Sequence, residues 1–187
     1  MRFRTLEHVT NAADRRGPYP PALEAVLAPG DLALARDEIA AWPGYASTPL
    51  VSLDGLARAH GLGAVHYKDE SRRFALKSFK ALGGALAVDR LVRRLGGDPG
   101  EITVCCATDG NHGRSVAWGA QRVGCRCRIY IHATVSEGRR RAIEAFGAEV
   151  VRTPGNYDDS VRRAADDAAA AGWHVVSDTS YPGYTEI

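Results

Sequence analysis

The sequence predicts an α/β fold of mostly parallel sheets with flanking helices. From Thr48 onward, short apolar runs rich in β-branched residues alternate with longer runs of helical periodicity. The apolar runs have the length of buried strands, and the helical runs place charged residues opposite an apolar stripe. Before about Trp42 the chain is rich in alanine, proline and charge. We expect that segment to be an N-terminal arm rather than part of the sheet.

The same pattern places the individual elements. Strands are expected at residues 64–68, 102–108, 126–132, 149–152 and 173–177. Two helices between them carry apolar stripes, formed by Gly84, Ala87, Val88, Leu91, Val92 and Leu95 and by Tyr157, Val161, Ala164, Ala165 and Ala168. The arm holds at most a short helix around residues 31–41. We therefore expect helices packed on a sheet, with their charged sides in solvent.

The composition argues against two classes of function. The 187 residues contain 24 Lys and Arg against 22 Asp and Glu, so the formal charge of +2 provides no field that would recruit nucleic acid. Arginines 139–141 come without an aromatic platform for bases. No apolar run approaches membrane-spanning length, and the first residues lack the apolar core of a signal peptide. We expect a cytoplasmic protein whose partner is a small molecule, not nucleic acid or a membrane.

The four cysteines do not indicate a metal site. Cys105 and Cys106 are adjacent, and Cys125 and Cys127 alternate, so neither pair has the two-residue gap of a zinc knuckle. We expect buried, reduced thiols and no metal.

Lys80 lies one turn before the first apolar stripe and on the same face. An ammonium group there must be paired, neutral or functional, because burying it unpaired is costly. A snorkelling lysine at a frayed helix end fits the periodicity equally well. A lysine that forms a Schiff base needs a free amine near neutral pH, which a helix N-terminus and desolvation both favour.

A polar turn follows the strand expected at 102–108, and another polar residue follows the strand expected at 173–177. The turn reads Thr108-Asp109-Gly110-Asn111-His112-Gly113-Arg114 and leads into a helix with Gly113, Val116, Ala117 and Ala120 inside. N–H groups at such a helix start bind carboxylate or phosphate. Asn111 can hold an aromatic hydroxyl, whereas Asp109 alone would also serve as a helix cap. Asp178 lies at the edge where α/β sheets bind ligands, although aspartate is also a common turn former.

Four ordered motifs lie between about Trp42 and the end of the chain. They are Trp42-Pro43-Gly44-Tyr45 with Thr48-Pro49-Leu50; Lys68-Asp69-Glu70-Ser71 with Arg73-Phe74 and Phe79-Lys80-Ala81-Leu82-Gly83-Gly84; Ala107 to Arg114; and Asp178-Thr179 with Gly183-Tyr184. Together they resemble the diaminopropionate ammonia-lyases, a pyridoxal-phosphate-dependent family. The resemblance implies the tryptophan-synthase-β-like fold (PLP fold type II), and pyridoxal 5'-phosphate as the cofactor.

The resemblance also implies a role for each motif residue. Lys80 would form the internal aldimine with the cofactor, and Asn111 would contact the pyridine hydroxyl. The substrate-binding residues would be Thr108, Asp109, Gly110 and His112. Asp109 would suit a second amino group or act as the base for the D-isomer, whereas related serine and threonine dehydratases carry a small neutral residue there. Asp178 would position or deprotonate the substrate.

The implied reaction is α,β-elimination of 2,3-diaminopropionate to pyruvate and ammonia, in amino-acid catabolism, by proteins that are homodimers when full-length. Two positions depart from the family motif: Lys77 replaces an asparagine and Ala75 replaces a glycine. If the helix reached back to Lys77, its ammonium would lie one turn from Lys80 and lower that group's pKa. The alternative is that Lys77 points into solvent.

Against the family fold, the chain is expected to be incomplete. Residues 1–47 would form the arm, 48–78 the first part of the larger domain, and 79–187 most of the smaller α/β domain. The C-terminal half, with the glycine-rich loop for the cofactor phosphate and the partner of the pyridine nitrogen, would be absent. Three hypotheses follow: an ammonia-lyase or a fragment of one, a serine/threonine dehydratase-like lyase, or a truncated non-catalytic remnant of the same fold. Asp109 argues against the second.

Overall fold

The N-terminal part of the chain forms a unit of its own. The computed structural model describes residues 17–24, 27–179 and 184, and the chain divides into compact units Met1–Asp37 and Glu38–Ile187. Helix α1 (Pro21–Glu24) was not predicted, whereas α2 (Pro29–Ala40) confirms the helix expected near residues 31–41. The domain boundaries expected at residues 47 and 78 stay predictions. Gly183 of the last motif lies outside the described residues.

A four-stranded parallel sheet forms the centre of the second unit. Its strands are β3 (Thr103–Ala107), β4 (Arg126–Ile131), β5 (Glu149–Arg152) and β6 (His174–Val175), in the order β5-β4-β3-β6. All three pairings are parallel, which confirms the predicted fold class. Strand β6 is shorter than the expected 173–177. Every residue of β3 is buried, as in a strand covered on both faces.

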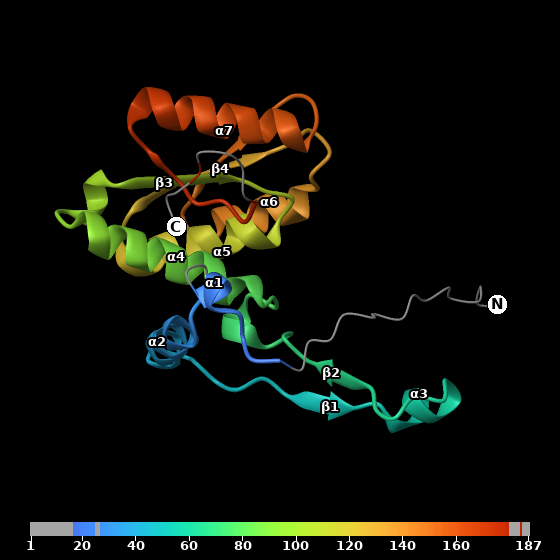
Figure 1. The fold of residues 1–187 in the computed structure, drawn as a ribbon. Helices are drawn as coiled ribbons and strands as arrows, with labels where there is room; N and C mark the ends of the chain where they lie inside the picture. The colour runs from blue at the N-terminus through green and yellow to red at the C-terminus, as the bar shows by residue number, and fades with distance from the viewer. Residues whose placement is uncertain (1–16, 25–26, 180–183, 185–187) are drawn as a thin grey trace. The chain divides into compact units, whose positions relative to one another are not determined.

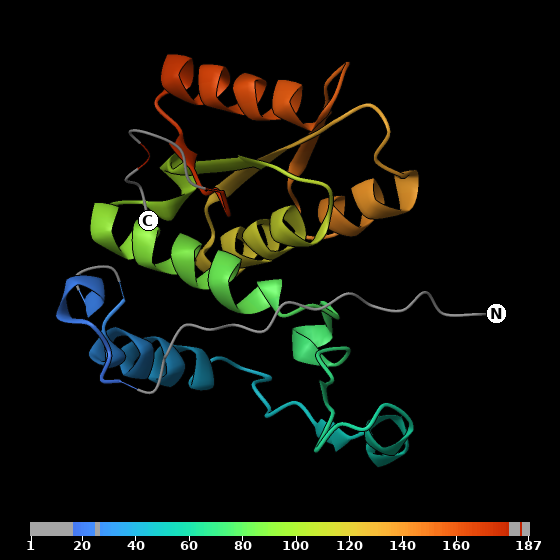
Figure 2. The same cartoon turned by 45° about the vertical axis from the view of Figure 1, so that its right-hand side comes forward.

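Helices cover both faces of this sheet (Figure 1, Figure 2). They are α4 (Lys80–Leu95), α5 (Asn111–Val123), α6 (Glu137–Glu144) and α7 (Tyr157–Ala171). Helices α4, α5 and α6 lie on one face and α7 lies on the other. Along β3, Val104 and Cys106 pack on the α4–α5–α6 side, whereas Cys105 and Ala107 pack toward α7. Because successive side chains of β3 point to opposite faces of the sheet, this one strand contributes to both apolar cores.

Local signals set the ends of these helices. Asn156 caps α7 in a reciprocal capping box with Asp159, and Ser136 caps α6. Helix α5 ends at Gly124, which adopts the left-handed conformation. The expected apolar stripes are confirmed except at Leu95, which is 44% exposed because it lies in the last turn of α4. Among the described residues, none of the helices is long and apolar enough to span a membrane.

Helices α4 and α5 approach closely because glycines lie between them. A Cβ on Gly119 would lie 2.8 Å from the Cα of Ala85, and a Cβ on Gly84 would lie 2.6 Å from the Oγ of Ser115. Ser115 also donates its hydroxyl hydrogen to the carbonyl oxygen of Lys80, at 2.6 Å. The start of α4, and with it Lys80, is thereby held against α5.

The strand expected at residues 64–68 does not join the parallel sheet. It is β2 (His66–Lys68), which pairs antiparallel with β1 (Leu50–Ser52), and α3 (Asp54–Ala59) connects the two. Two strands joined by so short a connection pair antiparallel, because a parallel pair needs a longer crossover connection.

A buried charge network follows β2. The Arg73 guanidinium binds both carboxylate oxygens of Glu70, at 2.8 and 3.0 Å. It also donates to the hydroxyl of Thr48 and to the carbonyl of Ala46. Thr48, Glu70 and Arg73 all belong to the motifs that carry the family resemblance. Their contacts join the segment before β1 to the loop after β2.

The loop between this network and α4 contains non-glycine residues in the left-handed region. The φ angles are 46° for Phe74, 60° for Ala75 and 58° for Lys77. Glycine and asparagine tolerate such angles best, and they are the residues that the resemblance leads us to expect at positions 75 and 77. Lys77 is exposed and α4 begins only at Lys80. The idea that a helix carries both lysines is therefore wrong, and the alternative of Lys77 in solvent is confirmed.

Candidate active site

The strand order of the parallel sheet reverses between β3 and β6. The chain runs from β3 through α5 to β4 and through α6 to β5, and α7 then returns it to β6 on the other side of β3. Open α/β sheets bind ligands at such a switch point, beyond the carboxyl ends of the strands. The polar turn at residues 108–112 follows β3 and Asp178 follows β6. Both segments that the sequence pointed to therefore lie at this edge.

A cavity of about 360 Å³ opens at this edge. It is lined by Lys80, Thr108, Asp109, Gly110, Asn111, His112, Tyr157, Asp178 and Thr179. All seven predicted site residues are in this lining. Tyr157 and Thr179 were not predicted for the site; Tyr157 was assigned only to the apolar stripe of its helix. A phenol in the first turn of a helix that follows a strand end was the signal that could have indicated it.

A larger cavity, of about 490 Å³, lies at the opposite edge of the sheet. Its charged groups include Arg128 and Glu149, which pair with each other at 2.5 Å, and the Arg128 guanidinium lies over the ring of Trp173. The chemistry of the sequence motifs does not reach that edge. We therefore assign the site by its reactive groups and not by the size of the cavity.

Lys80 and Asp178 form an ion pair at the wall of the 360 Å³ cavity. The Nζ of Lys80 lies 2.5 Å from the Oδ2 of Asp178, and the two side chains are 36% and 28% exposed. The expected burial of Lys80 is wrong, because the packed face of α4 ends where the cavity begins. Of the three possibilities for its ammonium group, paired, neutral or functional, the structure shows a paired group. The snorkelling alternative is wrong, since the amine is paired with Asp178, which follows β6, and does not extend alone into solvent.

His112 supports Asp178 from inside the protein. Its Nε2 lies 2.7 Å from the carbonyl oxygen of Val176, and its Nδ1 lies 3.8 Å from the Oδ2 of Asp178. A carbonyl oxygen only accepts, so Nε2 carries the hydrogen. Burial, assisted by the charge of Lys80, lowers the pKa of His112. The ring is therefore neutral at neutral pH, and it supports the Asp178 segment through the Val176 carbonyl, since its Nδ1 makes no hydrogen bond to the carboxylate.

Asp178 is an ionised carboxylate in this arrangement. Burial raises the pKa of Asp178. The hydrogen bond from Lys80 and the positive charge of the same ammonium group outweigh burial and hold this pKa below its ordinary value. A carboxylate in contact with a primary amine can hold or release a proton at that amine.

The turn after β3 is closed by Thr108. Its hydroxyl oxygen accepts the N–H groups of Gly110 and Gly113, each at 3.0 Å. A Cβ on Gly113 would lie 2.5 Å from the methyl carbon of Thr108, so the approach requires glycine. The N–H groups of Asn111 and His112 belong to the first turn of α5, which no intrahelical acceptor reaches. Such an open helix end suits a carboxylate.

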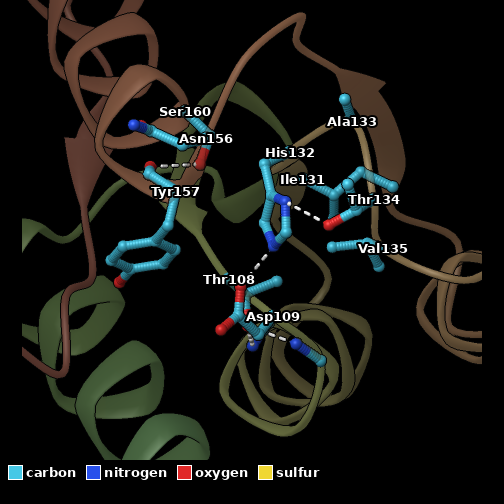
Figure 3. A network of polar contacts seen from close by, with 12 residues as sticks. Thr108, Asp109, Ile131, His132, Ala133, Thr134, Val135, Asn156, Tyr157 and Ser160 are labelled. Carbon is cyan, nitrogen blue, oxygen red and sulfur yellow. Dashed lines mark hydrogen bonds and ion pairs between the residues drawn. The ribbon is translucent and has the colours of Figure 1, made fainter.

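Asp109 faces His132 rather than the helix that it precedes (Figure 3). The Nε2 of His132 lies 2.8 Å from the Oδ1 of Asp109, and the hydroxyl of Thr134 lies 3.1 Å from the Nδ1 of the same ring. The N-cap of α5 is Gly110, without a side-chain hydrogen bond. The alternative of Asp109 as a cap is therefore wrong. The sequence pattern did not point to His132, although a histidine directly after an apolar strand was a usable signal.

The cysteines do not supply a nucleophile. All four are free, with Cys105 and Cys106 buried as expected and Cys125 and Cys127 only half-buried. Burial raises the pKa of Cys105 to about 12 and that of Cys125 to about 11. Since the thiolate is the reactive form, these thiols are inert near neutral pH. In the part of the chain that the structure describes, no group of three or more His, Cys, Asp or Glu side chains could hold a metal ion.

Known proteins resemble this chain in sequence and in structure. The family model described as "Pyridoxal-phosphate dependent enzyme" matches residues 41–187. Diaminopropionate ammonia-lyase of Escherichia coli K12 is 43% identical over an alignment of 158 residues that covers 77% of this chain and 40% of that protein. The crystal structure of the E. coli enzyme in apo form has a TM-score of 0.79 at 40% identity and covers 84% of this chain and 46% of its own. Its complex with D-serine gives the same TM-score at 39% identity, covering 84% of this chain and 44% of its own. The chain spans less than half the length of these relatives.

Proposed function

Since the chain belongs to the pyridoxal-phosphate-dependent enzymes, and pyridoxal phosphate is therefore its cofactor, we propose that it carries the catalytic residues of a carbon–nitrogen lyase. The reaction is the α,β-elimination of 2,3-diaminopropionate to pyruvate and ammonia. The observation that carries this proposal is one cavity lined by the Lys80 amine, the Asn111 amide and the carboxylates of Asp109 and Asp178. The similarity to diaminopropionate ammonia-lyases supports the choice of substrate.

The side chains of the cavity suit this cofactor. An aldehyde condenses with a primary amine, and Lys80 offers one at the cavity wall. Asn111 offers a neutral amide that can hydrogen-bond to the ring hydroxyl. Among the described residues of the lining, Lys80 is the one lysine or arginine. We assign the phosphate, following the resemblance, to a glycine-rich loop of the family fold outside these residues.

When bound, the cofactor supplies the electron sink for the elimination. The chain itself supplies orientation and proton transfer. The open N–H groups of Asn111 and His112 at the start of α5 bind the substrate carboxylate, and Gly110, which has no side chain, lets that carboxylate approach. Thr108 shapes that turn through its hydroxyl, and His112 steadies the side of the cavity that carries Asp178.

Asp109 and Asp178 have separate tasks in this proposal. The α-hydrogens of the two mirror-image substrates project to opposite faces, so each needs a base on its own side. We assign the D-isomer to Asp109, following the resemblance, and the L-isomer to Asp178 with Lys80. The two carboxylates follow neighbouring strands and have different partners, His132 and Lys80. Asp109 also offers a negative charge to the second amino group of the substrate, which serine lacks.

The first experiment uses the full-length protein with added pyridoxal phosphate. We expect an absorbance band of lysine-linked cofactor that disappears in Lys80→Ala. Lys77→Ala is the matched control, since Lys77 is an exposed lysine of the preceding loop, and it should keep the band. A parent protein without any band would favour the non-catalytic remnant.

The second experiment separates the lyase from a dehydratase. Pyruvate release should be faster from diaminopropionate than from serine, and Asp109→Ser should narrow that preference. Equal rates from the two substrates in the parent would overturn the assignment of Asp109 to the second amino group.

We also propose a cytoplasmic location and a homodimeric full-length protein active in amino-acid catabolism. The free cysteines support a reducing compartment, and the dimer and the pathway rest on the resemblance. Light scattering of the full-length protein measures its oligomeric state.

The proposed division into an arm, a larger-domain part and a smaller domain, at residues 47 and 78, can be tested by limited proteolysis.

A further inference from the structure

The contact between Asp109 and His132 follows from the sheet itself. Strands β3 and β4 are neighbours in which Ala107 pairs with Tyr130. Asp109 and His132 each follow one of these paired residues by two positions, so they leave the same edge side by side (Figure 3). Their 2.8 Å contact is therefore a consequence of register and not of a flexible surface encounter.

The direction of the hydrogen bonds in this contact is determined. A carboxylate oxygen only accepts, so the Nε2 of His132 is the donor to Asp109. When the ring is neutral, its Nδ1 accepts from the hydroxyl of Thr134, 3.1 Å away. The neutral ring is thereby held as one tautomer between a donor and an acceptor.

The segment that carries His132 is itself anchored. The Nη1 of Arg152 donates to three backbone carbonyl oxygens, those of His132, Ala133 and Val135, at 3.3, 3.0 and 2.7 Å. The His132 side chain is 18% exposed, whereas that of Asp109 is 64% exposed. An anchored donor thus meets an exposed acceptor at the cavity wall.

We propose that His132 is a positioning residue that holds the Oδ1 of Asp109 and directs its Oδ2 to the α-proton of the substrate. An exposed aspartate alone samples several rotamers, each with a different carboxylate direction. Among the described residues, the Oδ2 of Asp109 has no hydrogen-bond partner, so that oxygen remains available for the substrate. His132 does not line the cavity and acts through Asp109. This inference rests on the function proposed above.

The test compares two substitutions at His132 in the full-length protein loaded with cofactor. His132→Phe keeps a ring and removes the donor, whereas His132→Gln keeps an N–H donor. We expect His132→Phe to lower kcat for the D-isomer by about 10- to 100-fold, the usual cost of removing a partner that orients a functional group. KM, the rate with the L-isomer and the cofactor absorbance band should change little. His132→Gln should recover most of the loss.

His66→Phe is the matched control, because His66 is an exposed histidine of β2 that is not among the residues lining the cavity. It should leave the rates with both isomers unchanged. An equal loss with both isomers, an effect on KM alone, or a His132→Gln protein as slow as His132→Phe would overturn the proposal.

A second measurement needs neither cofactor nor turnover. In ¹⁵N NMR spectra of the protein without cofactor, His132 should show the Nε2–H tautomer, with slow exchange of that hydrogen that becomes fast in Asp109→Ala. A parent protein that releases ammonia from neither isomer contradicts the proposed function but leaves this measurement intact. An Nδ1–H tautomer, or exchange that Asp109→Ala does not change, overturns the positioning contact itself.

Discussion

The Arg73 cluster and the Lys80 cluster are both ion pairs built from motif residues, yet their groups are partnered differently. Arg73 is 7% exposed and its guanidinium binds Glu70 through two nitrogens, with further bonds to a hydroxyl and a backbone carbonyl. Lys80 is 36% exposed, and its amine has one carboxylate partner, Asp178, at the wall of a cavity. One cluster is closed and the other is open to a ligand.

This difference separates architecture from chemistry. A bidentate, buried pair with additional hydrogen bonds holds its segments together and leaves no group for a substrate. A single, half-exposed pair leaves amine and carboxylate able to exchange partners. Residues that belong to the same set of family motifs therefore have different roles, and the surroundings of each residue decide which role it has.

The largest expected effect is on the free energy of unfolding, which tests the difference between the two clusters. Arg73→Ala should lower the free energy of unfolding by about 3 kcal/mol, because it leaves the carboxylate of Glu70, which is only 18% exposed, without its charged partner. Lys80→Ala should lower it by less than about 1 kcal/mol, because that pair is partly solvent-exposed. Urea unfolding followed by circular dichroism measures both. Arg72→Ala, at an exposed neighbour, is the control and should be nearly neutral. Similar losses at residues 73 and 80 would remove the distinction.

The Arg73 cluster should also make the stability of the protein depend on pH in the acid range. The hydrogen bond from Arg73, opposed by burial, lowers the pKa of Glu70 from 4.5 to about 2. A depressed carboxylate pKa adds stability above the unfolded value that is lost as the pH falls through the folded value. The advantage of the parent over Glu70→Gln, at most on the order of 3 kcal/mol, should therefore shrink between pH 4.5 and about 2. The measurement is the free energy of unfolding of both proteins across this pH range at constant salt. A difference between the parent and Glu70→Gln that stayed constant would contradict the prediction.

The open cluster depends on the packing of α4 against α5. Gly119→Ala should cost about 1–3 kcal/mol, since the new Cβ would lie 2.8 Å from the backbone of Ala85. Displacement of α4 would move Lys80, so cofactor titration by absorbance should show weaker binding. Gly83→Ala on the same helix has nothing within 4 Å of its new Cβ and should gain up to about 1 kcal/mol. Equal effects at the two glycines would show that the helices do not pack as closely as their backbones indicate.

The smallest effect concerns the loop between the clusters. Ala75→Gly should raise the free energy of unfolding by up to about 1 kcal/mol, because glycine adopts the φ of 60° without strain. Lys77→Asn should act in the same direction by less. Ala169→Gly, at an exposed position of α7, should have the opposite sign because its helical φ favours alanine. Thermal unfolding compares the three, and a destabilised Ala75→Gly protein would contradict the left-handed conformation.

The elements were predictable because local spacing encodes them, and seven of the nine residues that line the cavity were predictable from the motifs. Alternation and helical periodicity indicated the parallel sheet, and motif order indicated the residues that line the cavity. The errors lie where elements end. Leu95 is exposed because it lies in the last turn of α4, Lys80 is only half-buried because its side chain borders the cavity, and β6 is shorter than its apolar run. A periodic pattern continues past the last residue that a neighbouring element covers.

The sequence by itself determined the fold class, the apolar stripes and the list of candidate site residues, since local periodicity and short motifs encode them. Only the tertiary structure decided their partners. Lys80 meets Asp178 across 98 positions, and Asp109 meets His132 across 23. Asp109 meets His132 because β4 pairs with β3, whereas Lys80 meets Asp178 because the start of α4 is held against α5 and Asp178 follows β6 at the same edge of the sheet. Strand order is set by how helices pack on the two faces, a long-range choice that no local period in the chain records.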